Sequence, residues 1–219
     1  MKQEALKTLL ERFGQRYSEV LGIKLETASD SEVFKWFLAS ILFGAPITES
    51  SVMKTYKRFE EYKVLTPERL LKTRWNGLVK ILDEGGYTRY DFKTADKLLL
   101  VTGNLKKEFN GSLSLLHQKA SDSADLENRL KELGKGIGDI TISIFLRDLR
   151  GIWKKADPKP TPLVILAARN LGIIKTGQPQ KALEEMKMFW NRNTIVDYSF
   201  VNFETALLRF GKDSRRKKN

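Results

Sequence analysis

Three glycines alternate with other residues in the segment Leu133-Gly134-Lys135-Gly136-Ile137-Gly138-Asp139-Ile140-Thr141. Glycine lets the backbone turn tightly and come close to another surface, because no side chain stands in the way. Apolar residues at helical spacing follow, so we expect a helix to begin here with its first N–H groups and positive dipole end pointing outward. Such a helix start binds anions, and in a basic protein the matching anion is a nucleic-acid phosphate. The alternative is a glycine-rich joint between two packed helices.

The charge of the chain favours a polyanionic partner. Its 219 residues include 39 Lys and Arg against 27 Asp and Glu, which gives a formal net charge of +12. Nucleic acid and an acidic membrane surface both fit such an excess. Residues 212–219 form a basic tail, for which we expect disorder and non-specific attraction to phosphates.

Cysteine and histidine usage excludes several kinds of chemistry. The chain has no cysteine, which excludes disulfides, thiolate metal sites, iron–sulfur clusters and cysteine nucleophiles. Its one histidine, His117, excludes His-rich metal sites and lies in an apolar context, where we expect a structural role. The N-terminus lacks a signal-peptide pattern, and no apolar run approaches about 18 residues. We therefore expect a soluble intracellular monomer, cytoplasmic or nucleoid-associated, with no membrane partner.

The elements that must position the glycine turn are helices. Helical periodicity recurs along the chain and strand-like alternation is scarce, so the sequence predicts an all-α fold. Prolines are dense only in residues 157–162, which must be extended or turning. Capping residues and prolines predict helix starts at Ser29 with Glu32, at Thr48 or Ser50, at Thr66 with Pro67, and at Thr161 with Pro162.

Three further motifs stand in order around the turn: Trp36-Phe37-Leu38-Ala39-Ser40-Ile41-Leu42-Phe43, Glu84-Gly85-Gly86-Tyr87 and Phe109-Asn110-Gly111. Over residues 31–171, this order resembles the helix-hairpin-helix DNA glycosylases, the superfamily of endonuclease III and the bacterial alkylpurine glycosylases. The family hairpin reads Leu-Pro-Gly-hydrophobic-Gly-x-x-Thr-Ala. This chain keeps both glycines and the threonine, with a lysine in place of the proline.

The resemblance implies a two-lobed helical protein with a helix-hairpin-helix motif and a central cleft. One lobe would cover residues 31–135, with the hairpin at its end, and the other would combine 1–30 with 139–211. In such hairpins main-chain N–H groups hold a DNA phosphate, and main-chain carbonyls hold a monovalent cation. The implied DNA-binding residues are Gly134, Lys135, Gly136, Ile137 and Gly138, and the carbonyls of Gly134 and Ile137 would take a sodium or potassium ion. No other cofactor or metal is implied.

The residues after the hairpin restrict the implied chemistry. Bifunctional members of the family carry a catalytic lysine where this chain has Ile140, so Schiff-base lyase chemistry is absent. Single-function members use water and one carboxylate, which stabilises the oxocarbenium-like sugar or positions the water. Spacing from the hairpin gives that place to Asp157, whereas matching the start of the next helix gives it to Thr161, which carries no charge. Asp157 as a plain turn residue is the further alternative.

Base flipping also needs a wedge and a pocket. The loop after residue 43 falls where the family keeps its wedge, so Pro46 and Ile47 are wedge candidates, although a simple helix-stop loop fits as well. Trp153, close to Asp157 in sequence, is the candidate pocket aromatic. Asp139 suits the helix dipole but repels phosphate, so its side chain must point away from DNA or the hairpin binds more weakly.

Together these residues predict a DNA repair enzyme of base excision, a hydrolase. It would be a single-function DNA glycosylase that cleaves the N-glycosidic bond of a damaged or mismatched base in double-stranded DNA. The alternative is a non-catalytic helix-hairpin-helix DNA-binding protein that has lost the catalytic carboxylate. Pocket shape rather than any motif sets which base is removed.

Overall fold

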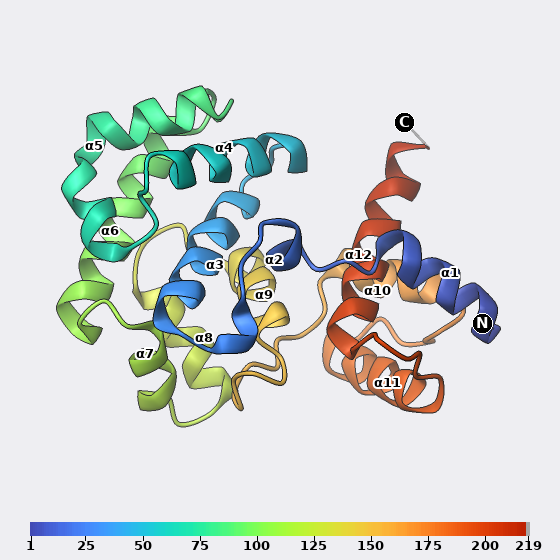
Figure 1. Cartoon of the computed structure of the whole chain (residues 1–219). Coiled ribbons are helices and arrows are strands. Elements are labelled where there is room, and N and C mark those ends of the chain that lie inside the picture. Colours follow the sequence, from blue (N-terminus) through green and yellow to red (C-terminus); the bar gives the residue numbers. More distant parts are fainter. Residues whose placement is uncertain (218–219) are drawn as a thin grey trace. The chain divides into compact units, whose positions relative to one another are not determined.

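The computed structural model describes residues 1–217, and this part of the chain is all-α, with no strand. The chain folds as two compact units (Figure 1). Leu21–Asp157 form the first, which we call the central unit. Met1–Val20, together with the residues from Pro158 onward, form the second, which we call the terminal unit.

The central unit holds the glycine turn. Its elements are the 3-10 helix η1 (Leu25–Thr27), α3 (Asp30–Phe43), α4 (Glu49–Glu61), α5 (Pro67–Glu84), α6 (Asp91–Phe109), α7 (Leu113–Lys119), α8 (Ser123–Glu132) and α9 (Asp139–Asp148). The terminal unit contains α1 (Gln3–Phe13), α2 (Tyr17–Val20), α10 (Pro162–Asn170), α11 (Pro179–Arg192) and α12 (Phe200–Arg216).

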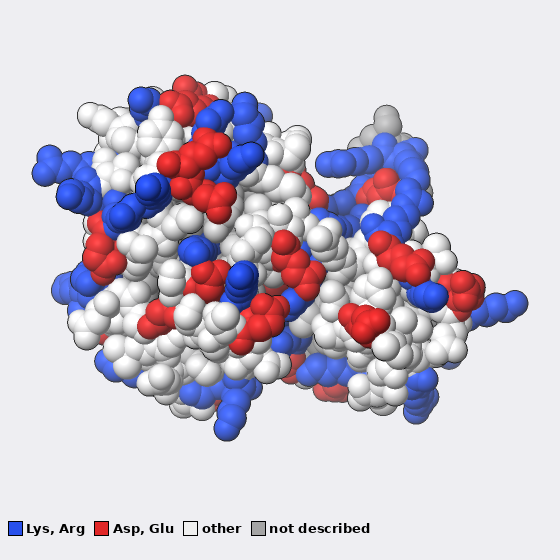
Figure 2. All heavy atoms as spheres, viewed as in Figure 1, with Lys and Arg blue, Asp and Glu red and all other residues white. Residues whose placement is uncertain are grey.

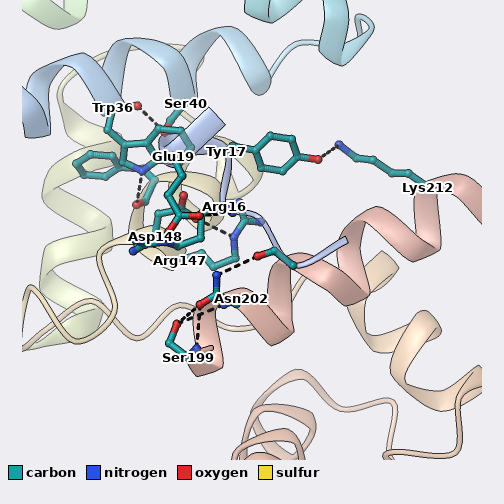
Figure 3. A network of polar contacts seen from close by, with 12 residues as sticks. Arg16, Tyr17, Glu19, Trp36, Ser40, Arg147, Asp148, Ser199, Asn202 and Lys212 are labelled. Atoms are coloured by element: carbon teal, nitrogen blue, oxygen red, sulfur yellow. Dashed lines mark hydrogen bonds and ion pairs between the residues drawn. The ribbon is translucent and has the colours of Figure 1, made fainter. Parts of the chain in front are cut away.

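Helix α3 is the core of the central unit. It is apolar on all sides, so it is buried almost throughout, and it packs against α4, α7 and α9. The indole Nε1 of Trp36 donates to the carbonyl of Phe145 in α9 at 3.0 Å, and Ser40 Oγ donates to the carbonyl of Trp36 (Figure 3). The rings of Phe37 and Phe145 meet edge to face at 5.0 Å. These contacts fix α9, the helix that follows the turn.

Helices α5 and α6 form a packed pair on the same unit. Helix α5 is broken at Arg74, whose φ of 59° and ψ of 177° lie outside the helical region. That combination is essentially a glycine conformation, so the chain holds local strain at an arginine. The kink divides α5 into two segments, and Trp75 is the first residue after it.

Helix α12 is the core of the terminal unit and packs against α1, α10 and α11. Ser199 and Asn202 form a capping box at its start. Asn202 Nδ2 also donates to the carbonyl of Gly14, just after α1, at 3.0 Å (Figure 3). Gly211 permits α10 to approach closely, because a Cβ there would lie 3.0 Å from Leu163. The two ends of the chain are therefore packed together in one unit.

The unit boundaries differ from those expected, 31–135 for one lobe and 1–30 with 139–211 for the other. Helix α9 and the residues up to Asp157 belong with the central unit. The reason is the apolar face of α9, which is buried against α3. The cleft expected between the two lobes stays a prediction.

The basic tail is also partly helical rather than disordered. Helix α12 extends through Arg216, and Lys217 Nζ lies 3.0 Å from Asp213 Oδ2, one turn earlier. Cationic side chains at a helix C-terminus complement its dipole, which favours this extension. Residues 218–219 of the expected tail lie outside the described residues. Within residues 1–217, no helix combines the length and the apolar character that a membrane crossing requires.

Candidate nucleic-acid interface

The glycine turn joins α8 to α9 in the central unit. Leu133 follows α8, and the N–H of Ile137 donates to the carbonyl of Gly134 at 3.2 Å, which closes the turn. Gly136 has a φ of +97°, a conformation that side chains rarely adopt. The carbonyl of Leu133 accepts from Asn104 Nδ2 of α6 at 2.9 Å. The turn is thus held from outside as well as from within.

The turn lies directly on α6. A Cβ at Gly134 would stand 2.8 Å from Val101 Cγ2, so only glycine permits this approach. The side chain of Lys97 lies against Gly136, because a Cβ at Gly136 would stand 2.6 Å from Lys97 Cε. Partial burial lowers the pKa of Lys97 below its ordinary value. Because α6 supports the whole turn, its main-chain groups are fixed before any ligand arrives.

The outer side of the turn is exposed. Lys135, Gly136 and Gly138 are exposed, whereas Ile137 is buried and anchors the loop. Gly138 is the N-cap of α9, and no side chain caps this helix start. The first N–H groups of α9 therefore have no side-chain acceptor, and the dipole adds positive potential there. An anion is the ligand that suits this position.

Asp139 is held by a lysine across the turn. Lys131 Nζ of α8 lies 2.7 Å from Asp139 Oδ1, and the aspartate side chain is 88% exposed. The hydrogen bond that Lys131 donates to the Asp139 carboxylate raises the pKa of Lys131. The carboxylate is thereby drawn toward α8 and partly neutralised, which reduces its repulsion of a phosphate at the turn.

The loop between α3 and α4 lies beside the start of α9. A Cβ at Gly44 would stand 2.3 Å from Thr141 Oγ1, so the loop backbone touches the first turn of α9. Pro46 is exposed and Ile47 is half-buried. Ile140, the second residue of α9, is 62% exposed. The structure thus places the wedge candidates and the turn on neighbouring segments, while the wedge role itself stays a prediction.

Asp157 is paired with an arginine. Arg150 Nη1 donates to Asp157 Oδ1, and the arginine side chain is 7% exposed against 40% for the aspartate. The short segment between them turns back on itself, with the N–H of Trp153 donating to the carbonyl of Leu149. The Asp157 carboxylate is thus reachable by solvent on one side and bound to a buried guanidinium on the other.

Trp153 is packed in the core of the central unit. It is 5% exposed, stacks on His117 at 4.5 Å between ring centroids, and meets Phe145 edge to face. This burial weighs against its predicted use as a pocket aromatic. Asp148, the carboxylate on α9 itself, is fully buried beside Arg147, whose Nε lies 3.2 Å from Asp148 Oδ1.

Thr161 occupies the N-cap of α10, as predicted, but its side chain makes no capping hydrogen bond. Its Oγ1 is buried without a hydrogen-bond partner among the described residues. Asp157 is the last residue of the central unit and Thr161 lies in the terminal unit, so the choice between them as the catalytic position stays open.

The predicted cation site is partly occupied by the turn itself, because the carbonyl of Gly134 already accepts from Ile137. A sodium or potassium ion there stays a prediction. Among residues 1–217, no group of three or more His, Cys, Asp or Glu side chains is arranged to hold a metal ion.

Sequence reasoning missed Lys97 and Lys131, the two lysines that come to the turn from α6 and α8. Lys97 carries no local signal, since its contact depends on how α6 packs. Lys131 stands in the last turn of α8, and its charge opposite to that of Asp139 is the one local signal for this ion pair. Figure 2 shows Lys and Arg interspersed with Asp and Glu on the face in view, so the positive charge there is spread out.

The chain matches no protein-family model, no curated protein and no solved structure.

Proposed function

We propose that this protein binds double-stranded DNA through residues 133–140 and acts on it as a single-function DNA glycosylase. The observation that carries the proposal is the exposed start of α9, which Gly138 opens and no side chain caps. Lys135 adds charge beside it, and α6 holds it rigid. A backbone phosphate would accept hydrogen bonds from the first N–H groups of α9.

Hydrolysis would then use water as the nucleophile and the carboxylate of Asp157 as the stabilising group. The N-glycosidic bond breaks, the base leaves with the electron pair and takes up a proton, and water adds to the sugar carbon with loss of its own proton. A carboxylate stabilises the positive charge that develops on the sugar. Ile140 offers no amine, so no covalent Schiff base forms.

A second candidate function is non-catalytic DNA binding. The ion pair between Arg150 and Asp157 favours it, because a guanidinium already compensates the charge that the sugar would need. The same turn and the same phosphate contacts would serve both functions. The two differ only in whether the abasic product is formed.

Binding is tested by Gly138→Val. Gly138 has a φ of −106°, and a Cβ there meets nothing within 4 Å, so the fold tolerates the change. The added side chain blocks the phosphate, and we expect duplex affinity to fall roughly 10- to 150-fold, the value of one charge-assisted hydrogen bond. Fluorescence anisotropy with a labelled duplex measures this. Gly103→Ala in α6, also with no atom within 4 Å, is the control; equal affinity of both variants contradicts the phosphate site.

Catalysis is tested with duplexes that each carry one alkylated, deaminated or oxidised base. We expect one of them to yield an abasic site, revealed by alkaline cleavage, and Asp157→Asn to abolish that product while duplex affinity is kept. Retained binding without any product across the panel supports the non-catalytic function. A product rate that Asp157→Asn leaves unchanged contradicts the role of Asp157.

A further inference from the structure

Two aromatic side chains form an exposed pair on the central unit. Trp75 of α5 is 37% exposed and Phe92 of α6 is 56% exposed, and their ring centroids are 5.2 Å apart. The other three tryptophans are at most 6% exposed, so Trp75 differs from all of them. We call Trp75 and Phe92 the aromatic pair. Its rings are held at 43° to each other and leave aromatic surface open to solvent.

The aromatic pair is fixed in place. Trp75 Nε1 donates to Asp96 Oδ1 of α6 at 2.9 Å, which anchors the indole by its polar edge. Trp75 directly follows Arg74, where the break in α5 sets its direction. At the start of α6, the N–H of Phe92 donates to Asp91 Oδ1 at 2.7 Å. A ligand that stacks here meets rings that are already oriented.

The charged neighbours of the aromatic pair favour a polyanion. Arg74 and Lys93, each adjacent in sequence to one of the rings, are exposed and make no ion pair within residues 1–217. Asp91 and Asp96, the nearby carboxylates, are engaged by a backbone N–H and by the indole. Each carboxylate keeps its negative charge, because its donor is neutral, so this surface offers a phosphate the two exposed cations rather than a net positive charge.

The aromatic pair lies on the same helix that supports the glycine turn. Phe92 is the second residue of α6, and Lys97 and Val101 of α6 lie against Gly136 and Gly134. At 1.5 Å per residue, five residues of helix separate Phe92 from Lys97 by about 8 Å along the axis. The turn and the aromatic pair are thus both carried by the first half of α6.

We propose that the aromatic pair stacks an unpaired base of a DNA strand, at a site separate from the phosphate contact of the turn. The inference rests on the proposed DNA binding and adds a preference for duplexes that carry an unpaired segment. Every base offers a flat π-face to an aromatic ring, whereas a paired base inside a duplex is covered by its neighbours. Arg74 and Lys93 would hold the phosphates that flank the stacked base.

The experiment compares a flush-ended duplex with the same duplex carrying a six-nucleotide thymidine overhang. Anisotropy gives the two affinities, and tryptophan emission reports stacking, because Trp75 is the exposed indole. We expect the overhang to bind more tightly and to quench emission. Trp75→Ala should reduce overhang affinity about 5- to 150-fold, the range for one base–aromatic stack, and leave flush-duplex affinity unchanged.

Two further variants keep the result interpretable. Trp75→Phe retains an aromatic face, so it should keep most of the overhang preference. Met188→Ala, which removes a 51% exposed side chain of α11, is the matched surface control and should change nothing. Equal overhang preference in Trp75→Ala and in the unmodified protein overturns the inference.

The two proposals fail in different ways. In one outcome, the unmodified protein binds the duplex and Gly138→Val weakens this binding, but loss of the aromatic pair has no effect. This outcome overturns only the stacking site. If the unmodified protein does not bind the flush-ended duplex, the proposed function is overturned. If it still binds a free thymidine oligonucleotide in the same assay, and this binding depends on Trp75, the stacking site is supported on its own.

Discussion

Asp139 is placed where two electrostatic demands conflict. A carboxylate in the first turn of α9 is favoured by the helix dipole, yet the same place is where a phosphate would bind. Lys131 resolves part of the conflict by pairing with Asp139 at 2.7 Å. The pair keeps a cation and an anion engaged beside the turn, so the unliganded turn presents less positive charge than its lysines alone provide.

Replacing Asp139 by Asn should tighten DNA binding. The change removes one negative charge and releases Lys131, and repulsion between close surface charges of about 1 kcal/mol corresponds to about fivefold in affinity. Anisotropy titrations at low and high salt measure the gain, which should shrink as salt screens it. Gln118→Ala, at an exposed position of α7, is the control. Weaker binding by Asp139→Asn contradicts this account.

At this scale the sequence predicted the turn but not its neighbours. Gly134, Gly136 and Gly138 carry their own signal, because glycine spacing has a local conformational meaning. The partner of Asp157 could not be predicted, since Arg150 reaches it through a turn of irregular backbone. The burial of Trp153 likewise depends on α7, whose position is set by packing and not by local sequence.

Helix α7 meets the segment after α9 at a stacked pair of rings, His117 on Trp153. The Nε2 of His117 is buried and has no hydrogen-bond partner among the described residues. Burial, and then the charge of Lys155, lower the pKa of this imidazole below its ordinary value of 6.5. Lys155 Nζ itself donates to the carbonyl of His117 at 2.9 Å. The pair thus joins α7 to the segment after α9 through a neutral ring.

His117 should make the protein less stable as pH falls below 6.5. The unfolded chain takes up the proton more readily than the folded one, so stability is complete above the unfolded pKa. It declines toward the folded pKa by at most about 1.4 kcal/mol per pH unit. Urea unfolding at pH 7.5, 6.5 and 5.5 measures this.

The variant His117→Phe keeps a ring for the stack and removes the titration. Its free energy of unfolding should be nearly constant over the same range. Because the chain has one histidine, an NMR titration follows this imidazole without overlap. A decline of equal slope in the variant would assign the pH dependence to other groups.

Helix starts were the best predicted part of the elements. Ser29, Thr48 and Thr66 each accept a hydrogen bond from the backbone N–H three residues later, as N-caps do. The capping box at Ser29 is only half formed, because Glu32 accepts from the backbone N–H of Lys24 instead. The break at Arg74 had no signal, since neither glycine nor proline marks it.

Over the whole molecule, the sequence predicted helical class and two lobes but not the boundary between them. The expected boundary followed the hairpin, because the hairpin is where the local pattern changes. The observed boundary follows packing instead, with Phe145 of α9 buried against α3. Such contacts join residues more than a hundred positions apart, and local periodicity does not report them.

The terminal unit should depend on α1 more than the central unit does. Leu6 is 1% exposed, and α1 packs against α12. Leu6→Ala should cost about 2–5 kcal/mol, as such truncations do in cores. Hydrogen exchange should accelerate in residues 1–20 and from 158 onward, and stay slow in 21–157.

Lys7→Ala on the same helix is the control, because the Lys7 side chain is 54% exposed. It should leave the exchange pattern unchanged. Uniform acceleration across both units in Leu6→Ala would show instead that the whole chain unfolds in one cooperative step.

The pairing of the two chain ends has a consequence for biosynthesis. Helix α1 is made before its partner α12, and the whole central unit is made between them. At about 5–20 residues per second, the intervening synthesis takes roughly 10–40 s, long enough for the central unit to fold. During that interval the apolar face of α1, with Leu6 and Leu10, has no α12 to cover it. The apolar face of α1 must therefore stay protected in the nascent chain until α12 has been made.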